Sequence, residues 1–266
     1  MTKEALILQI RKKKSFLCVG LDTSIDKIPP HLLAEEDPIF EFNKQIIDAT
    51  KDLCVAYKIN TAFYEALGAK GWESMAKTVD YIPAEHFKIA DAKRGDIGNT
   101  SDQYAKAFFE TIPFEAITVA PYMGSDSVKP FLAHQGKWTI VLGLTSNEGS
   151  QDFQQQKAGT QFLYEKVIKK VAEWGSDENL MFVVGATKTE ELAAIRNLIP
   201  NHFLLIPGVG FQGGSLPEVV KHGRNKDIGL LVNVSRAIIY ASKKENFATE
   251  ARKIALNYQT EMKQYL

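Results

Sequence analysis

The sequence predicts an α/β fold of the (β/α)8 barrel type, with eight parallel strands inside an outer ring of helices. Three observations predict it: eight short apolar runs, helix-like stretches between them, and a nearly constant spacing. From Gly20 to Ser235 the chain makes seven repeats of about 31 residues each, which is the length of one strand–helix–strand unit. The 266 residues have room for eight such units, and we expect residues 1–266 to form a single domain.

The predicted strands are apolar nearly throughout, which is typical of strands that are buried on both faces. They are the runs 16–21, 55–59, 87–90, 116–120, 138–144, 181–184, 203–207 and 229–233. Helices are predicted over 43–52, 66–81, 99–109, 159–173, 189–198 and 248–265. The alternative is a doubly wound open sheet, which would have six or seven strands and a Gly-x-Gly-x-x-Gly turn after the first. The turn that follows the first run here, GLDTS, lacks that pattern.

Composition excludes several classes of partner. Lys plus Arg and Asp plus Glu each total 32, so the net charge is zero and there is no excess of basic residues for nucleic acid. Cys18 and Cys54 lie in apolar runs and are predicted to be small core residues in a reducing compartment. No run approaches the ~20 residues of a membrane span, and the N-terminus has no secretory pattern. We therefore expect a cytoplasmic protein without nucleic acid or membrane partners.

Polar residues gather where the predicted strands end. In a (β/α)8 barrel these ends share one mouth, and active sites lie there. Lys58 ends an apolar strand, and an unpaired buried ammonium group is costly, so it needs acidic partners. Asp22 and Asp91 are the nearest candidates on the adjacent strands. The polar residues at the strand ends are Asp22, Lys58, Asn60, Asp91, Lys93, Asp96, Thr145, Ser146, Asn147, Ser235 and Arg236.

The most informative stretch is 91–100, DAKRGDIGNT, at the end of the third strand. Strand side chains alternate between faces, so Asp91 and Lys93 are predicted to point the same way. Asp96 follows a glycine, where the chain can turn back over them. A lysine between two carboxylates stays protonated, which makes it a proton donor and a poor nucleophile. The alternative for such a motif by itself is a surface salt-bridge cluster.

A second motif, PGVGFQGG at 207–214, follows the seventh strand directly. Glycines let backbone N–H groups approach an anion closely, and the planar guanidinium of Arg236 suits a phosphate. Together they predict a phosphorylated small-molecule substrate, although glycines that only allow tight turns are an alternative. The long polar loop 145–156 is either an ordinary exposed loop or a lid over the mouth. If it is a lid, Ser146 from this loop and Gln212 from the glycine-rich loop would meet over the ligand.

These motifs resemble the orotidine 5′-phosphate decarboxylase family, in its longer bacterial and mycobacterial-type subfamily. The resemblance covers essentially the whole chain, and the stretch 91–100 is its most specific part. The segments VGLD at 19–22, YK at 57–58, TSN at 145–147, PGVGFQGG at 207–214 and NVSR at 233–236 follow in the expected order. Phe211 stands where many relatives have a smaller residue, which affects loop packing and not chemistry.

The resemblance implies a carboxy-lyase that converts orotidine 5′-phosphate to UMP and CO2 in de novo pyrimidine synthesis, without a metal or an organic cofactor. It implies that Lys93 protonates C6 of the pyrimidine while Asp91 and Lys58 hold it in place. It implies a homodimer with shared active sites, in which Asp96 and Thr100 reach into the neighbouring subunit. The implied substrate-binding residues are Asp22 at the ribose, Ser146 at the pyrimidine, Gln212 between base and phosphate, Arg236 at the phosphate, and Thr100, Pro207, Gly208, Gly210, Gly214 and Ser235.

Three other functions stay open at this point. The same Asp-x-Lys-x-x-Asp arrangement with Mg²⁺ would give an aldolase or epimerase acting on a sugar phosphate, with the carboxylates as metal ligands. A Schiff-base aldolase needs a lysine of lowered pKa, and flanking aspartates have the opposite effect. The third is a nucleotide-binding barrel that has lost its activity.

Overall fold

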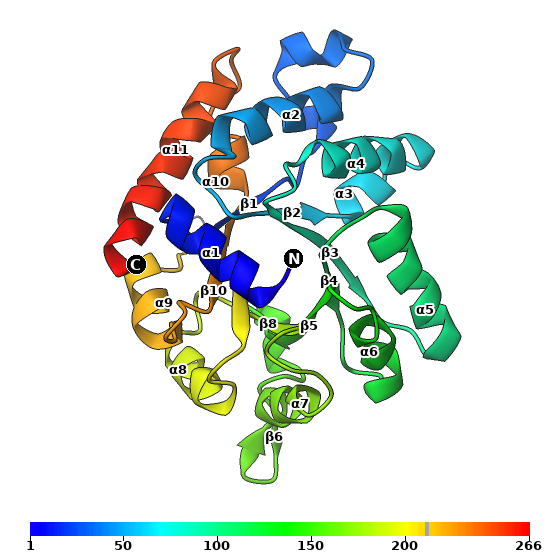
Figure 1. The fold of residues 1–266 in the computed structure, drawn as a ribbon, viewed down its shortest axis with the longest axis vertical. Coiled ribbons are helices and arrows are strands. Elements are labelled where there is room, and N and C mark those ends of the chain that lie inside the picture. The colour runs from blue at the N-terminus through cyan, green and yellow to red at the C-terminus, as the bar shows by residue number, and fades with distance from the viewer. Residues whose placement is uncertain (211–212) are drawn as a thin grey trace.

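Eight parallel strands close into a barrel with the helices outside it, so the fold is a (β/α)8 TIM barrel as predicted (Figure 1). The computed structural model describes residues 1–210 and 213–266. Around the barrel the strand order is β1-β10-β9-β8-β5-β4-β3-β2. The strands are β1 Leu17–Gly20, β2 Ala56–Asn60, β3 Phe87–Arg94, β4 Ala116–Val119, β5 Trp138–Leu144, β8 Leu180–Val184, β9 Phe203–Pro207 and β10 Leu230–Val234.

The helices differ more from the prediction than the strands do. The longer ones are α1 Lys3–Lys13, α2 Pro38–Thr50, α4 Ala69–Tyr81, α5 Gly98–Lys106, α6 Ser125–Leu132, α7 Leu163–Ala172, α8 Thr189–Leu198, α9 Leu216–Gly223 and α11 Phe247–Met262, and the short ones are α3 Ala62–Glu65 and α10 Arg236–Ile239. α6 and α9 were not predicted; Pro130 lies inside α6 and Pro217 in the first turn of α9. Pro130 interrupts the helical sequence pattern of α6, and α9 is a short helix of 8 residues.

Several predicted helix boundaries are wrong, and the helix predicted over 43–52 begins five residues earlier, as α2 at Pro38. The helix predicted over 66–81 begins only at Ala69, as α4, because the residue before it, Gly68, has a non-helical backbone with a positive φ of 63°. The short helix α3 ends before this predicted range, at Glu65. The helix predicted from residue 159 begins only at Leu163, because β6 Lys157–Ala158 and β7 Gln161–Phe162 form a small antiparallel hairpin before it. The helix predicted over 99–109 ends as α5 at Lys106 and continues as one π-helical turn, Ala107–Thr111.

The N-terminal helix α1 lies across one end of the barrel in Figure 1. Its residues Leu6 and Ile10 are buried in the core, and Trp138, at the start of β5, donates through Nε1 to the Met1 carbonyl oxygen at 2.8 Å. This covers the end at which the strands begin. The side chains at the ends of the strands therefore face the opposite mouth, where the candidate site lies.

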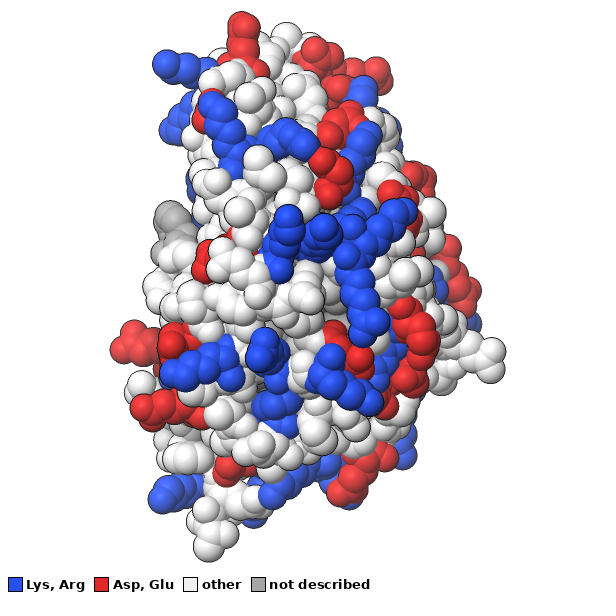
Figure 2. Space-filling model, turned by 60° about the vertical axis from the view of Figure 1, so that its left-hand side comes forward, with Lys and Arg blue, Asp and Glu red and all other residues white. Residues whose placement is uncertain are grey.

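The distribution of charged side chains and the burial of the two cysteines agree with what the composition predicts. Basic and acidic side chains are interspersed on the face drawn in Figure 2, with one group of adjoining basic side chains near its centre. Cys18 and Cys54 are buried and unbonded, as predicted. Within residues 1–210 and 213–266, no helix combines the length and apolar character needed to cross a membrane.

Candidate active site

The ends of five neighbouring strands, β3, β2, β1, β10 and β9, surround a cavity of about 160 Å³ at the mouth of the barrel. Seven of the predicted site residues line it: Asp22, Lys58, Asp91, Pro207, Gly208, Ser235 and Arg236. Asn60, one of the polar residues predicted at the strand ends, also lines it, as does Asn233, which was given no role in the site. The structure thus brings the charged strand ends and the start of the glycine-rich loop to one place.

A buried lysine links two aspartates in this cavity. Lys58 is 4% exposed, and its Nζ donates to Asp22 Oδ1 at 3.2 Å and to Asp91 Oδ2 at 2.8 Å, as predicted. Burial would lower the pKa of Lys58, but the two carboxylates outweigh it and raise that pKa above its ordinary value. Lys58 therefore carries a fixed positive charge inside the mouth.

Asp91 joins this buried pair to Lys93. The Nζ of Lys93 donates to Asp91 Oδ1 at 2.6 Å, and the Lys93 side chain is about half exposed. Burial would raise the pKa of Asp91, but the charges of Lys58 and Lys93 outweigh it and hold that pKa below its ordinary value. The result is a chain of alternating charges that ends in an ammonium group open to the mouth.

The second oxygen of Asp22 is also engaged. Ser235, after β10, donates its hydroxyl proton to Asp22 Oδ2 at 2.6 Å. A Cβ on Gly20 would lie 1.9 Å from that hydroxyl oxygen, so the approach requires a glycine. The Tyr240 hydroxyl donates to the Asp22 carbonyl oxygen at 3.0 Å, a contact that sequence reasoning missed because an apolar helix end carries no signal of it.

The glycine-rich loop after β9 has the backbone that only glycine adopts readily. Gly208, Gly210 and Gly213 have φ of 97°, 78° and 86°. The loop turns tightly, since the Gly210 N–H donates to the Gly214 carbonyl at 2.9 Å and the Gly213 N–H to the Gly210 carbonyl at 2.8 Å. Gln212, predicted to bridge base and phosphate, lies outside the described residues, as does Phe211.

Arg236 is the first residue of α10 and lines the mouth beside Gly208. Its strand, β10, pairs in parallel with β9, which leads into the glycine-rich loop. A guanidinium group and a glycine-rich turn at neighbouring strand ends form a suitable binding place for a phosphate dianion.

Asp96 and Thr100 do not join the charged array of their own chain. Asp96 accepts from the Ile97 N–H at 2.8 Å, and among the described residues no ion pair joins it to Lys93. The expectation that one chain holds Lys93 between two aspartates is therefore wrong. The third strand, predicted to end at residue 90, continues to Arg94, which forms an ion pair with Glu65. Thr100 lies exposed in the first turn of α5.

Ser146 lies after β5, held close to β8. Gly185 is so near that a Cβ there would be 2.7 Å from the Ser146 Cβ. The loop that follows is internally bonded: the Thr145 N–H donates to Gln154 Oε1 at 2.8 Å, and the loop ends in the β6–β7 hairpin. Ser146 does not line the described cavity, so its part in the site depends on the position of this loop.

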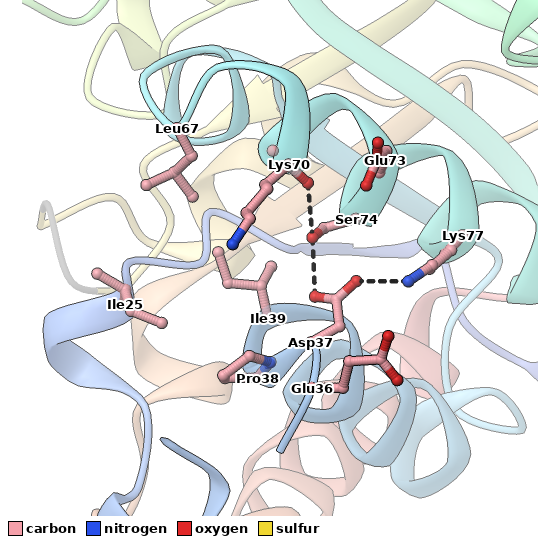
Figure 3. Close-up of a pocket in the computed structure, with 11 residues that line it drawn as sticks. Ile25, Glu36, Asp37, Pro38, Ile39, Leu67, Lys70, Glu73, Ser74 and Lys77 are labelled. Carbon is pink, nitrogen blue, oxygen red and sulfur yellow. Dashed lines mark hydrogen bonds and ion pairs between the residues drawn. The ribbon is translucent and has the colours of Figure 1, made fainter. Parts of the chain in front are cut away.

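A larger hollow lies outside the mouth, between α2 and α4 (Figure 3). Its carboxylate Asp37 caps α2 through the Phe40 N–H at 3.1 Å. The same carboxylate accepts from Ser74 at 2.8 Å and from Lys77 at 3.2 Å, both on α4. Asp37 is thus occupied in joining two helices, and the hollow is a junction between them.

Comparison with known proteins gives one consistent result. The model of one family, described as the orotidine 5′-phosphate decarboxylase / HUMPS family, matches residues 15–254. The orotidine 5′-phosphate decarboxylase of Phocaeicola vulgatus is 59% identical over 100% of this chain and 99% of its own length, and that of Flavobacterium johnsoniae is 61% identical over 98% and 97%. The solved OMP decarboxylase of Leishmania donovani is 36% identical, covers 98% of this chain and 100% of its own, and has a TM-score of 0.82.

Proposed function

The chain belongs to the orotidine 5′-phosphate decarboxylase / HUMPS family, and from this premise we propose how its barrel mouth carries out the reaction. The reaction is the decarboxylation of orotidine 5′-phosphate to UMP and CO2 in pyrimidine synthesis. The observation that carries the proposal is the chain of alternating charges, Lys58–Asp91–Lys93, which runs from the buried Lys58 to the half-exposed ammonium group of Lys93 at the mouth of the barrel.

This array fits the chemical difficulty of the reaction. Loss of CO2 from C6 of the pyrimidine leaves a carbanion that no adjacent carbonyl group can delocalise. Rate enhancements of ~10¹⁷ require about 23 kcal/mol of transition-state stabilisation. A fixed cation beside the developing carbanion supplies a large part of it in a site shielded from water. In our proposal Lys93 is that cation, and it then donates its proton to C6.

The other groups position the substrate. Lys58 and Asp22 bind the ribose hydroxyl groups, because both face the cavity between Lys93 and the glycine-rich loop. Arg236 and the N–H groups of that loop bind the phosphate. The phosphate lies far from the reacting carbon, so its binding energy can hold the pyrimidine against Lys93 and raise the rate of the chemical step. Ser146 and Gln212 are assigned to the pyrimidine and the phosphate.

We also propose that the enzyme is a homodimer in which Asp96 and Thr100 complete the partner's site. Among the described residues, no ion pair or hydrogen bond joins either of them to Lys58, Asp91 or Lys93 of their own chain. Near them, in the loops after β3 and β4, three large apolar side chains are exposed: Ile97 at 53%, Tyr122 at 86% and Met123 at 49%. A second copy of the chain would cover this apolar surface and bring Asp96 to a neighbouring Lys93.

The test of the reaction is direct. Purified enzyme is mixed with orotidine 5′-phosphate, and the loss of orotate absorbance is followed together with CO2 release. We expect turnover that survives EDTA, whereas an aldolase or epimerase with magnesium-bound carboxylates would lose its activity. Borohydride would trap a sugar phosphate on a Schiff-base aldolase, and we expect no such adduct. A folded protein without turnover contradicts the proposal.

Variants test the assigned roles. Lys93→Ala should lower kcat by several orders of magnitude, with Lys170→Ala, an exposed lysine on α7, as a matched control that leaves kcat unchanged. A kcat for Lys93→Ala within about tenfold of wild type would rule out the proton-donor role. Mixing inactive Lys93→Ala and Asp96→Ala chains should restore part of the activity, because a mixed dimer contains one intact site. Subunit exchange without recovery would contradict the shared site.

A further inference from the structure

The backbone of Lys93 has an unusual conformation for a residue within a strand. Its φ is +48°, in the left-handed region that a side chain with a Cβ rarely adopts. Of the described non-glycine residues, Lys14 and Ile228 share a positive φ, but Lys14 ends a helix and Ile228 lies in a turn before β10. Strained backbone of this kind persists only where the surroundings hold it.

The pairing of β3 with β4 explains where the strain arises. Ala90 pairs with Ile117, and the next pair joins Arg94 to Val119. Three residues of β3, from Asp91 to Lys93, therefore lie opposite the single residue Thr118 of β4. Such a bulge re-aims side chains and leaves backbone groups of the longer strand without their usual partner.

Thr118 supplies the missing partner through its side chain. The Lys93 N–H donates to Thr118 Oγ1 at 2.9 Å, and Thr118 is completely buried. The same hydroxyl lies 3.1 Å from Asp91 Oδ1, the oxygen that accepts from Lys93 Nζ at 2.6 Å. An amide can only donate and an ionised carboxylate can only accept, so the hydroxyl proton must point at Asp91. One hydroxyl thus fixes the backbone of Lys93 and the carboxylate that holds its ammonium group.

We propose that Thr118 is a positioning residue for Lys93, and that its hydroxyl sets where the ammonium group stands in the mouth. The inference rests on the proposed function of Lys93 as the proton donor. Without the hydroxyl, the partly buried Lys93 N–H loses its acceptor and the Asp91 carboxylate loses one of the donors that hold it, so that it can rotate. A displacement of about 1 Å at the reacting centre costs up to ~100-fold in rate. The effect falls on kcat, because the ribose and phosphate contacts lie on β1, β2, β9 and β10.

The chain offers a closely matched control on the next strand. Thr139 lies on β5 opposite Ile117, is completely buried, and its hydroxyl has no hydrogen-bond partner among the described residues. Thr139→Val also replaces a hydroxyl by a methyl group at a completely buried position, but this hydroxyl forms no hydrogen bond with Lys93. Thr118→Ser gives the complementary test, because it keeps the hydroxyl and removes only the methyl group.

The experiment measures kcat and KM for orotidine 5′-phosphate, together with thermal unfolding, for wild type, Thr118→Val, Thr118→Ser and Thr139→Val. We expect Thr118→Val to lower kcat by about 10- to 100-fold with KM within about threefold. Thr118→Ser should recover kcat to within about threefold of wild type, and Thr139→Val should change neither constant. If Thr118→Val does not fold, Thr118→Cys replaces it, since a thiol is a poor hydrogen-bonding group.

Two results would overturn the proposal: a kcat for Thr118→Val equal to that of Thr139→Val, or a kcat for Thr118→Ser as low as that for Thr118→Val. A loss confined to KM would also overturn it, because the hydroxyl would then act on binding. Absence of turnover in the wild type is a different outcome, which would refute the proposed function itself.

Discussion

Replacing Lys58 by methionine removes the ammonium group that lies between Asp22 and Asp91 while keeping most of the side-chain volume. At an effective dielectric constant of about 20, charges separated by the observed 2.8 and 3.2 Å attract each other by about 5 to 6 kcal/mol. Desolvation of the ammonium group offsets much of this, at several kcal/mol per ion. Removing one partner of a buried ion pair costs about 3 to 5 kcal/mol, which we expect as the loss of unfolding free energy at about pH 8.

The sign of the pH dependence follows from the pKa of Asp91. In the wild type that pKa is held below its ordinary value, so the stabilising contribution is present above the unfolded pKa, about 4, and is lost only as the pH falls through the lowered value. Without Lys58, burial and the neighbouring carboxylate raise the pKa of Asp91 above the unfolded value. One carboxylate then takes up a proton in the native state, so the destabilisation should shrink between about pH 8 and pH 5.

Urea unfolding followed by circular dichroism at these two pH values measures the effect. The control is the double variant Lys58→Met with Asp22→Asn, which removes one carboxylate with the ammonium and leaves Asp91 paired with Lys93. It should regain at least half of the lost free energy at about pH 8. Equal losses in the single and double variants, or a single-variant loss below about 1 kcal/mol, would refute the electrostatic reasoning.

Three further variants test the frame of the site. Arg236→Ala should raise KM by about 10- to 100-fold with a smaller change in kcat, because a charged hydrogen bond to phosphate is lost; steady-state kinetics checks this. Gly20→Ala should displace the Ser235 hydroxyl and destabilise by about 1 to 3 kcal/mol in urea unfolding, and Ser235→Ala should suppress part of that loss. Arg196 is buried, which lowers its pKa to about 10, and it donates to five backbone carbonyl oxygens around β9 and β10. Arg196→Met should cost about 3 to 5 kcal/mol of unfolding free energy, and a change below about 1 kcal/mol would contradict that role.

The barrel was predictable because its strands are buried on both faces, and such runs are apolar along their whole length. Apolar character does not mark the part of a strand that extends beyond the core. β3 continues for four residues beyond its apolar part, through Arg94, and hydrophobicity cannot mark residues that are hydrogen bonded but face the mouth. α6 and α9 escaped prediction for a different reason: each has only 8 residues, too few for a clear helical period, and α6 also contains Pro130 in its interior.

In the candidate site, some contacts could be predicted from the sequence, and others become visible only in the folded structure. Burying an unpaired ammonium group is unfavourable in free energy, so a lysine within an apolar strand needs acidic partners, and those of Lys58 could be inferred on this ground. Thr118 gives no such signal, since a threonine within a buried β-branched run is an ordinary strand residue. Its role depends on a bulge between β3 and β4 that sequence periodicity does not specify.

The position of the site relative to the closure of the barrel has a physical consequence. β1 and β10 are the first and last strands of the barrel in sequence, and their pairing closes it. Across that seam Ser235 donates to Asp22, two residues 213 positions apart in the chain. The charged array therefore lies mostly on the N-terminal side of the seam, and the proposed phosphate site lies on the other. Binding of one substrate molecule across both sides should stabilise the closed barrel, because a ligand that binds only the folded state adds its binding free energy to folding.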